Sequence, residues 1–282
     1  MVVRVSTGGF NKISATEAVA LLNEKNIWDI ELSAGLYEDN LETKINNLIS
    51  LGNRMSFHNY YPRPKNDFVL NLGSQDHEIL NYSKEHCRYA IELASKLNIE
   101  YYSIHAGFCI DPLPEKLGRD VGGFHVNLYA KVRETFLNEL YDLASFSSEK
   151  NVKLMVENNV TSKNTFMKYH GQKVLLMSDL EDTIDLISNF PNNVGWLCDV
   201  AHLKVSAKSF GFEPSKLIKE NSKYIMGYHL SDNDGYEDSN QMFDQSSWFI
   251  DYLKFVEYVS VEVYSDLNEI KKCWLEAKKI FG

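Results

Sequence analysis

The sequence has only four cysteines in 282 residues, and no two of them have CxxC or CxxxC spacing. This scatter argues against a disulfide framework and against a thiolate zinc site. The chain also lacks the run of about 18 apolar residues that a membrane-spanning helix needs. Its start has no basic region followed by an apolar stretch and a cleavage site. We therefore expect a cytoplasmic protein in which Cys87, Cys109, Cys198 and Cys273 are reduced and mostly buried.

A concentrated run of basic residues is missing as well. The chain has 29 Lys and Arg against 39 Asp and Glu, which gives a formal net charge of −10. Proteins that bind phosphate backbones usually show a positive patch, so the balance argues against a nucleic-acid partner. A small neutral or cationic ligand, or a ligand held through a metal ion, fits the charge better. The sequence does not decide the oligomeric state, and it allows a homo-oligomer.

Short apolar runs alternate with amphipathic segments along the whole chain, and no Pro/Gly/Ser-rich linker divides it. This alternation is typical of repeated βα units. Eight strands are expected, at residues 2–5, 28–32, 55–58, 101–105, 152–157, 194–199, 225–229 and 259–263. Helices are expected after a capping box at Ser14 and Glu17, and at 41–51, 75–97, 126–150, 179–189, 214–221, 246–255 and 266–280. The pattern predicts an α/β fold, a single (β/α)8 TIM barrel over residues 1–282, with a doubly wound open sheet as the alternative.

Polar residues cluster at the C-terminal ends of the predicted strands. Because strand side chains alternate between faces, His58 shares a face with Ser56, and His105 with Ser103. Glu31 also occupies an inward position, between Ile30 and Leu32 of the second strand. The inward groups at or near six strand ends are His58, His105, Glu157, Asp199, His229 and Glu262. In barrels of this kind that rim is where the chemistry takes place.

Each of these groups has a plainer explanation when it is taken singly. A strand-end histidine is often structural, and a strand-end carboxylate often caps the next helix. Six converging titratable groups, however, would repel or stay desolvated unless a cation lies among them. The expected four-ligand site consists of Glu157, Asp199, His229 and Glu262. His58 and His105, with Glu157 as a bridge, are expected either to hold a second ion or to hydrogen-bond the substrate. Carboxylates and imidazoles suit Mn²⁺, Co²⁺, Zn²⁺ or Fe²⁺ better than Ca²⁺.

Five motifs resemble the xylose-isomerase-like barrel superfamily, which contains sugar isomerases and epimerases and also trinuclear-zinc apurinic-site endonucleases. They are IHAG at 104–107, VENN at 156–159, DVAH at 199–202, HLSDNDG at 229–235 and VEVY at 261–264. Their order and spacing extend the resemblance over nearly the whole chain. Analogy with the epimerase branch implies the same four metal ligands and a contact between His202 and substrate.

The sequence departs from the endonuclease branch at the third metal. That branch holds it through the histidine after the strand-six aspartate and through an Asp-x-His element after strand seven. Here His202 is present, but the nearest match to the second element is Asp238-Ser239-Asn240, and the usual GEG stretch is replaced by MFDQSSW. An amide is a weaker zinc ligand than imidazole, so the departure favours small-molecule chemistry.

We therefore predict a divalent-metal-dependent isomerase or epimerase, with one or two ions per chain, acting on a sugar or a related polyol-keto compound. Proton transfer would pass through a metal-stabilised enediolate. Glu157 and Glu262 are the expected bases, one on each face of the reacting carbon. His202, Asp232 and Glu31 are expected to bind substrate.

Arg63 and Lys204 are candidate phosphate contacts, although solvated surface explains them better. Trp196 is expected to pack between barrel and helices. The alternative function is a multinuclear-metal hydrolase or apurinic-site endonuclease-like phosphodiesterase that uses His58 and His105, and a further alternative is a non-catalytic barrel. Substrate specificity is expected in the loops at 59–67 and 108–123.

Overall fold

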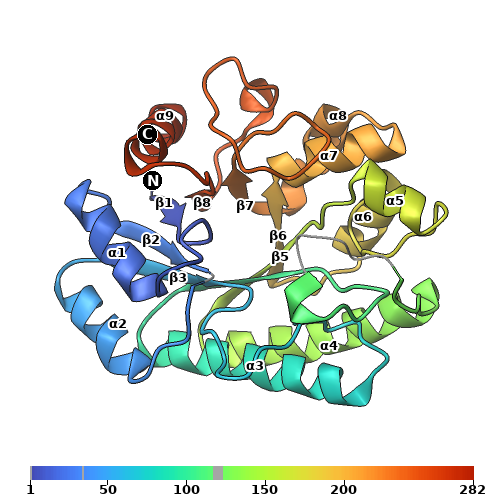
Figure 1. Cartoon of the computed structure of the whole chain (residues 1–282), viewed down its shortest axis with the longest axis horizontal. Helices are drawn as coiled ribbons and strands as arrows, with labels where there is room; N and C mark the ends of the chain where they lie inside the picture. The colour runs from blue at the N-terminus through green and yellow to red at the C-terminus, as the bar shows by residue number, and fades with distance from the viewer. Residues whose placement is uncertain (1, 34, 117–122) are drawn as a thin grey trace.

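The computed structural model describes residues 2–33, 35–116 and 123–282. Eight parallel strands pair in sequence order, and β8 pairs with β1, so the sheet closes into a barrel surrounded by helices (Figure 1). The strands are Val3–Ser6 (β1), Asp29–Leu32 (β2), Arg54–His58 (β3), Tyr101–His105 (β4), Lys153–Glu157 (β5), Val194–Asp199 (β6), Ile225–Leu230 (β7) and Tyr258–Val261 (β8). The predicted (β/α)8 barrel is confirmed, and the open-sheet alternative is wrong.

Helices follow most strands of the described chain. They are Ala15–Glu24 (α1), Leu41–Ser50 (α2), His77–Lys96 (α3), Tyr129–Glu149 (α4), Lys163–Lys168 (α5), Leu180–Ser188 (α6), Val200–Phe210 (α7), Pro214–Glu220 (α8) and Leu267–Phe281 (α9). Short 3-10 helices lie at Pro114–Lys116 (η1), Ser222–Tyr224 (η2) and Ile250–Tyr252 (η3). The capping box of Ser14 and Glu17 is confirmed at the start of α1. Within residues 2–33, 35–116 and 123–282, no helix is long and apolar enough to cross a bilayer.

The helix predicted at 246–255 is wrong, because only η3 is helical there. The Asp244 side chain accepts hydrogen bonds from the Ser246 backbone and hydroxyl, which favours a turn over a helix. Phe249 then turns into the core, where its ring lies 5.7 Å from that of Phe243. The chain after β7 is therefore an irregular segment that packs beside the barrel.

Two helices were not predicted. Ser162 caps the short α5, and α7 continues directly from β6 until Gly211, whose φ of +79° ends it. The loop at 59–67, in which the sequence predicts specificity, contains no helix. Of the irregular loop predicted at 108–123, residues 117–122 lie outside the described residues, and the described part contains η1.

The predicted alternation of side chains along the strands is confirmed. Phe57, Ile104, Val156 and Trp196 are fully buried in the large core between barrel and helices. A smaller apolar cluster inside the barrel consists of Tyr101, Met155, Leu197 and Tyr258. This inner cluster fills the barrel toward the N-terminal ends of the strands. The polar C-terminal strand ends gather at the opposite opening. All four cysteines are free and buried, as expected.

Candidate functional site

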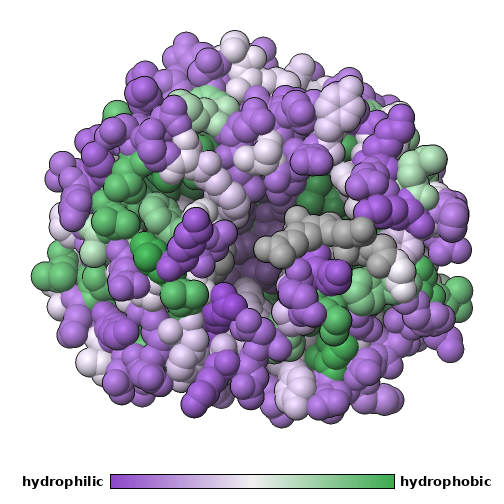
Figure 2. All heavy atoms as spheres, in the orientation of Figure 1, coloured by the Kyte–Doolittle hydropathy of each residue, from purple (hydrophilic) through white to green (hydrophobic). Residues whose placement is uncertain are grey.

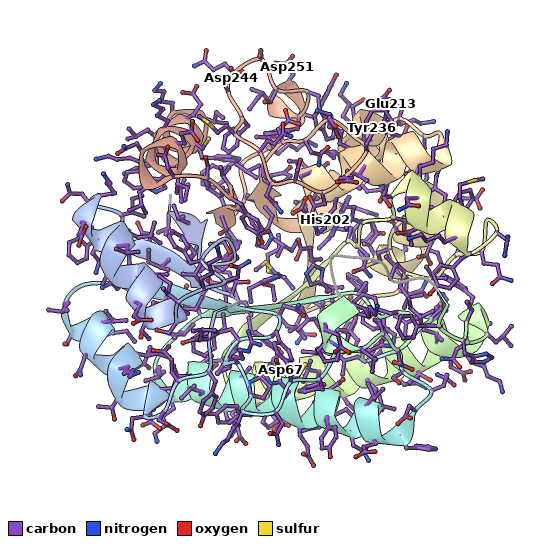
Figure 3. All side chains as sticks on the ribbon, viewed as in Figure 1. Asp67, His202, Glu213, Tyr236, Asp244 and Asp251 are labelled. Carbon is purple, nitrogen blue, oxygen red and sulfur yellow. The ribbon has the colours of Figure 1, made fainter. Side chains whose placement is uncertain are left out.

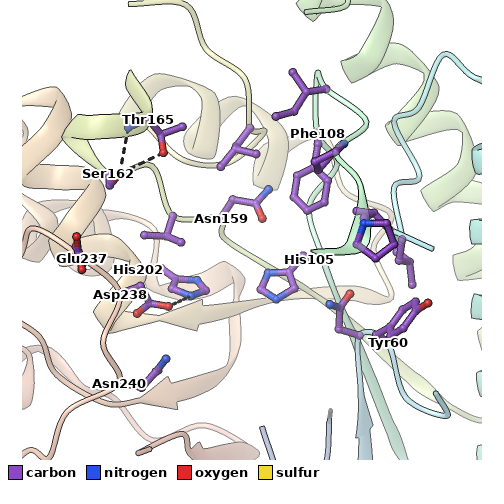
Figure 4. A pocket seen from close by; sticks show the side chains of 18 of the residues that line it. Tyr60, His105, Phe108, Asn159, Ser162, Thr165, His202, Glu237, Asp238 and Asn240 are labelled. Carbon is purple, nitrogen blue, oxygen red and sulfur yellow. Dashed lines mark hydrogen bonds and ion pairs between the residues drawn. The ribbon is translucent and has the colours of Figure 1, made fainter. Parts of the chain in front are cut away.

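The barrel opens into a deep cavity on the face shown in Figure 2, where polar residues surround a central hollow. Its volume is about 1510 Å³, and its walls come from the segments that follow β3 to β8. His105, His202 and Glu262 line it directly. Figure 3 shows His202 near the centre of this face, and Figure 4 shows it close to His105.

Four of the predicted ligands meet at one point beside this cavity. His229 Nδ1 lies 3.0 Å from Glu157 Oε1, 3.1 Å from Glu262 Oε2 and 3.9 Å from Asp199 Oδ2. One ligand atom from each residue falls within 4.8 Å of the others. The structure thus brings together the four side chains that the strand pattern selected from separate strands.

The donor set fits a divalent cation. Asp199 Oδ2, which faces this group, is buried without a hydrogen-bond partner, a costly state for a carboxylate oxygen. His229 Nε2 is 2.8 Å from Glu31 Oε2, which leaves Nδ1 to face the carboxylates. A histidine backed by a carboxylate and grouped with further carboxylates is a common arrangement for Mn²⁺, Fe²⁺, Co²⁺ or Zn²⁺.

The electrostatics of the four groups agree with this fit. Burial alone would lower the pKa of His229, but the carboxylates of Glu31, Glu157 and Glu262 outweigh it and raise the pKa well above its usual value. Burial raises the pKa of Asp199 well above its usual value. In the protein without an ion, protons therefore reside on groups that an ion would need deprotonated. Ion binding would release them, so affinity is expected to rise with pH.

Asp199 has two roles because its two carboxylate oxygens point in different directions. Oδ1 accepts a hydrogen bond of 2.7 Å from the His202 backbone and caps α7. Oδ2 faces His229 in the ligand group. The plain explanation of this residue as a helix cap is therefore correct, and it is compatible with the metal-ligand hypothesis.

His58 and His105 form a second group with Glu157. Their Nε2 atoms lie 3.4 Å and 3.6 Å from the unpartnered Glu157 Oε2. The other nitrogen of His58 is 2.9 Å from Ser103 Oγ. Burial lowers the pKa of His105 to about 4, so its ring is neutral. One of its nitrogens then has a lone pair that can bind an ion or accept a hydrogen bond. This geometry is compatible with both hypotheses from the sequence, that these histidines hold a second ion or that they contact substrate.

His202 is held differently, by acceptors at both ring nitrogens. Nδ1 lies 2.8 Å from the Asn158 carbonyl oxygen, and Nε2 lies 3.1 Å from Asp238 Oδ2. Both nitrogens therefore donate, and the ring is a cation. Burial opposes this charge, but Asp199 and Asp238 outweigh it and raise the pKa of His202 well above its usual value. The ring has no free lone pair with which to bind an ion.

The remaining parts of the trinuclear pattern are also engaged in other contacts. The side-chain oxygen of Asn240 accepts a hydrogen bond of 3.0 Å from Ser231 Oγ. Among the described residues, none of the ligand groups includes His202 or Asp238. The departure noted in the sequence thus coincides with an internal His202–Asp238 ion pair at the place where a third ion would need these side chains.

Two predicted substrate contacts lie away from the cavity surface. Glu31 has an exposed fraction of 0% and lies behind His229, where it also accepts a hydrogen bond from the Tyr258 hydroxyl. Asp232 pairs with Lys204 Nζ at 2.6 Å and accepts from its neighbour Asn233. Neither residue lines the cavity. Their positions favour support of the site over direct contact with substrate.

The candidate phosphate contacts are likewise occupied. Arg63 donates to the Gly35 carbonyl oxygen at 2.7 Å and pairs with Asp67 at 2.7 Å, although its side chain lines the cavity. Lys204 joins Asp232 and the Asn233 carbonyl oxygen. Both cations therefore stabilise loops around the opening.

Three residues that support the site lie in the VENN and VEVY motifs and in the Asp238-Ser239-Asn240 element, but the sequence assigned them no role. Asn158 accepts hydrogen bonds from Trp196 Nε1 and the Asp199 backbone, so it fixes the end of β6. Asp238 holds His202, and the Tyr264 hydroxyl donates to Glu262 Oε1 at 3.1 Å. The first asparagine of VENN and the tyrosine of VEVY are visible in the sequence, but single residues do not reveal partners far along the chain.

Glu31 is a positioning residue for His229. The Tyr258 hydroxyl on the far side of Glu31 lies 2.9 Å from Ser56 Oγ, and Gly227 leaves room for Tyr258, since an added Cβ would lie 2.9 Å from Tyr258 Cβ. This packing holds the carboxylate against the imidazole. Such supporting carboxylates fix the tautomer and orientation of a metal-binding histidine.

Glu31→Gln is expected to weaken Mn²⁺ binding by about 10–100-fold, because the amide removes the negative charge behind His229. Competition with a fluorescent chelator measures the affinity. Ser56→Ala is the matched control, since it removes a partner of Tyr258 and leaves the Glu31–His229 contact intact. Unchanged affinity in Glu31→Gln would contradict the positioning role.

Comparisons with known proteins were made by sequence and by structure. A model of the xylose isomerase-like TIM barrel family matches residues 17–266. No match is found among curated protein sequences. In structure the chain is similar to a D-tagatose 3-epimerase-like protein, with a TM-score of 0.74 and 17% identity over 99% of this chain and 97% of that one.

Two further solved structures share the architecture. D-allulose 3-epimerase from Methylomonas sp. has a TM-score of 0.69 and 12% identity, over 98% of this chain and 96% of that one. A 3-keto-D-glucoside 4-epimerase from E. coli has a TM-score of 0.66 and 11% identity, over 99% and 98%. At such identities the likeness shows a common fold.

Proposed function

The chain belongs to the xylose isomerase-like TIM barrel family, and we propose that it is a divalent-metal-dependent sugar isomerase or epimerase. One observation carries the proposal: the carboxylates of Glu157 in β5, Asp199 in β6 and Glu262 just after β8 converge on His229 Nδ1 beside an open cavity. The names of structurally similar proteins, which include ketose 3-epimerases, support a sugar as the substrate class.

The proposed ion would be held by Glu157, Asp199, His229 and Glu262. When bound there, it supplies positive charge that stabilises negative charge developing on substrate oxygens. His202 adds a second positive charge close to this group, because its cationic ring places Nδ1 3.6 Å from Glu157 Oε1. The histidines at this site outweigh burial and lower the pKa of Glu157 well below its usual value, so this carboxylate is ionised.

Glu262 is the proposed base on the cavity side. It lines the cavity with an exposed fraction of 7%, and the Tyr264 hydroxyl orients its carboxylate. It would remove the proton from the carbon next to the substrate carbonyl. Epimerisation also needs a base on the opposite face, and we assign that role to Glu157. Because Glu157 has an exposed fraction of 0%, its proton transfer requires a closer approach of substrate than Glu262 does.

The hydrolase alternative has less support. Its two-ion form would use His58, His105 and Glu157, which are grouped closely enough. A trinuclear form would need His202 as a ligand, and this ring already donates from both nitrogens. Metal identity and number, a cytoplasmic location and self-association stay predictions from the sequence.

The proposed function is tested by incubating the Mn²⁺-loaded protein with a panel of ketohexoses in deuterium oxide. We expect deuterium at a carbon next to the carbonyl of at least one sugar, detected by proton NMR, and no uptake after treatment with a chelator. Absence of uptake in every ketose, together with cleavage of abasic-site DNA, would contradict the proposal and favour the hydrolase.

A further inference from the structure

We propose that the cavity takes an uncharged saccharide of disaccharide size, whose second unit packs on an aromatic wall formed by Tyr60 and Phe68. This inference rests on the proposed function for the identity of the reacting sugar unit. It adds the size and charge of the substrate and a second binding position, outside the ligand group, that the reaction itself does not require.

The cavity is large for a single sugar unit. At about 1510 Å³ it exceeds the roughly 300–1,000 Å³ of most small-molecule pockets. The proposed base Glu262 and the neighbouring His202 occupy one part of it. The cavity continues across the opening from Tyr264, after β8, to Phe108, after β4. Because the strands follow one another around a closed ring of eight, β4 lies opposite β8. A single sugar unit at the ligand group would leave the far side unfilled.

The charged side chains that line the cavity bear on the charge of the substrate. The described cationic side chains that line the cavity are Arg63, Lys163, Lys168 and the His202 imidazolium, and the acidic ones are Asp67, Glu115, Glu237, Asp238 and Glu262. Arg63 is already paired with Asp67. A phosphorylated or carboxylated sugar would therefore meet more acidic than basic groups. The lining favours an uncharged substrate.

Tyr60 and Phe68 form an aromatic wall whose rings are held by their neighbours. The Tyr60 ring stacks on His86 with centroids 5.5 Å apart, and Phe68 meets the Tyr60 ring edge-on at 5.3 Å. The Tyr60 hydroxyl accepts a hydrogen bond of 2.6 Å from the Phe68 backbone, which ties the two residues together. Burial lowers the pKa of His86 to about 4, so the backing ring is neutral. Both wall residues line the cavity, and Figure 4 shows Tyr60 on the side away from Asp238 and Glu237.

Such a wall is preformed and suits a sugar ring. Pyranose rings present a face of C–H groups, and aromatic side chains bury such apolar surface at low entropic cost. Tyr60 belongs to the loop at 59–67, one of the two loops in which the sequence predicted specificity, and Phe68 directly follows that loop. It lies outside the ligand group, so it can change affinity without changing the proton-transfer groups.

The test measures binding by calorimetry, with the Mn²⁺-loaded protein and four sugars. They are fructose and three disaccharides, maltulose, leucrose and isomaltulose, in which glucose is attached to O4, O5 or O6 of fructose. We expect at least one disaccharide to bind about tenfold more tightly than fructose. In Phe68→Ala that preference is expected to disappear, while the affinity for fructose stays the same.

Two variants serve as controls. Phe68→Trp keeps an aromatic wall and is expected to retain the preference. Phe255→Ala removes a ring that is 80% exposed and does not line the cavity, so both affinities are expected to stay unchanged. The inference is overturned if no disaccharide binds more tightly than fructose, or if Phe68→Ala weakens fructose and disaccharide equally.

Deuterium uptake in the same samples tests the proposed function separately. Tight disaccharide binding without uptake into any sugar supports the second binding position and contradicts the isomerase or epimerase activity. Uptake into fructose without a disaccharide preference supports the activity and overturns the inference.

Discussion

Glu262→Gln is expected to slow deuterium uptake into the sugar by about 10²–10⁴-fold, the usual contribution of a general base. Glutamine keeps the shape of the side chain and an oxygen that can still bind an ion, but it cannot accept the substrate proton. Glu262 is the carboxylate of the ligand group that lines the cavity, so no other carboxylate of that group is placed to replace it on that side. The measurement is the initial rate of uptake at saturating Mn²⁺.

Tyr264→Phe is the matched control for this prediction. It removes the hydroxyl that donates to Glu262 Oε1 and leaves the carboxylate in place. Its rate is expected to fall far less than that of Glu262→Gln. Uptake at the normal rate in Glu262→Gln, with the ion still bound, would show that Glu262 is not the base.

Asp199→Asn is expected to weaken Mn²⁺ binding by more than about 100-fold, the upper range for loss of a supporting residue that does not itself bind the ion. The change separates the two roles of Asp199. The amide oxygen can still accept from the His202 backbone and cap α7, whereas the amide nitrogen in place of Oδ2 cannot bind a cation. The helix should therefore survive while the ion is lost.

A thermal unfolding measurement tests both roles of Asp199, as helix cap and as metal ligand. Mn²⁺ at 100 times its dissociation constant stabilises the wild type by about 2.7 kcal/mol, which raises Tm by several degrees. In Asp199→Asn, Tm without the ion should stay close to that of the wild type, and Mn²⁺ should not raise it. Asp232→Asn changes a carboxylate that pairs with Lys204 outside the ligand group, so it should keep the full Mn²⁺ shift. An equal shift in Asp199→Asn would remove Asp199 from the ligand set.

The sequence could predict the inward groups because a strand has a period of two residues. Once the strand ends were placed, His58 and Ser56 had to share a face, and the closed barrel then forced six such ends to converge. This geometry depends on strand order and parity, which the apolar runs reveal. It does not depend on loop conformation.

The parts that were not predicted depend on contacts between distant residues. Glu31 has the right parity, but its depth behind His229 is set by the Tyr258 hydroxyl, which is 227 residues away in sequence. The positive charge of His202 is stabilised by Asp199 and by Asp238, and Asp238 lies on a loop whose path no local pattern determines. The segment at 246–255 has helical spacing, yet the burial of Phe249 and the turn at Asp244 outweigh it.

The most direct test of the account is anomalous scattering from crystals of the protein grown with Mn²⁺. The account predicts a strong peak bounded by Glu157 Oε1, Asp199 Oδ2, His229 Nδ1 and Glu262 Oε2, at about 2.0–2.3 Å from each ligand atom. A protein that binds Mn²⁺ with no peak among these four atoms would contradict it.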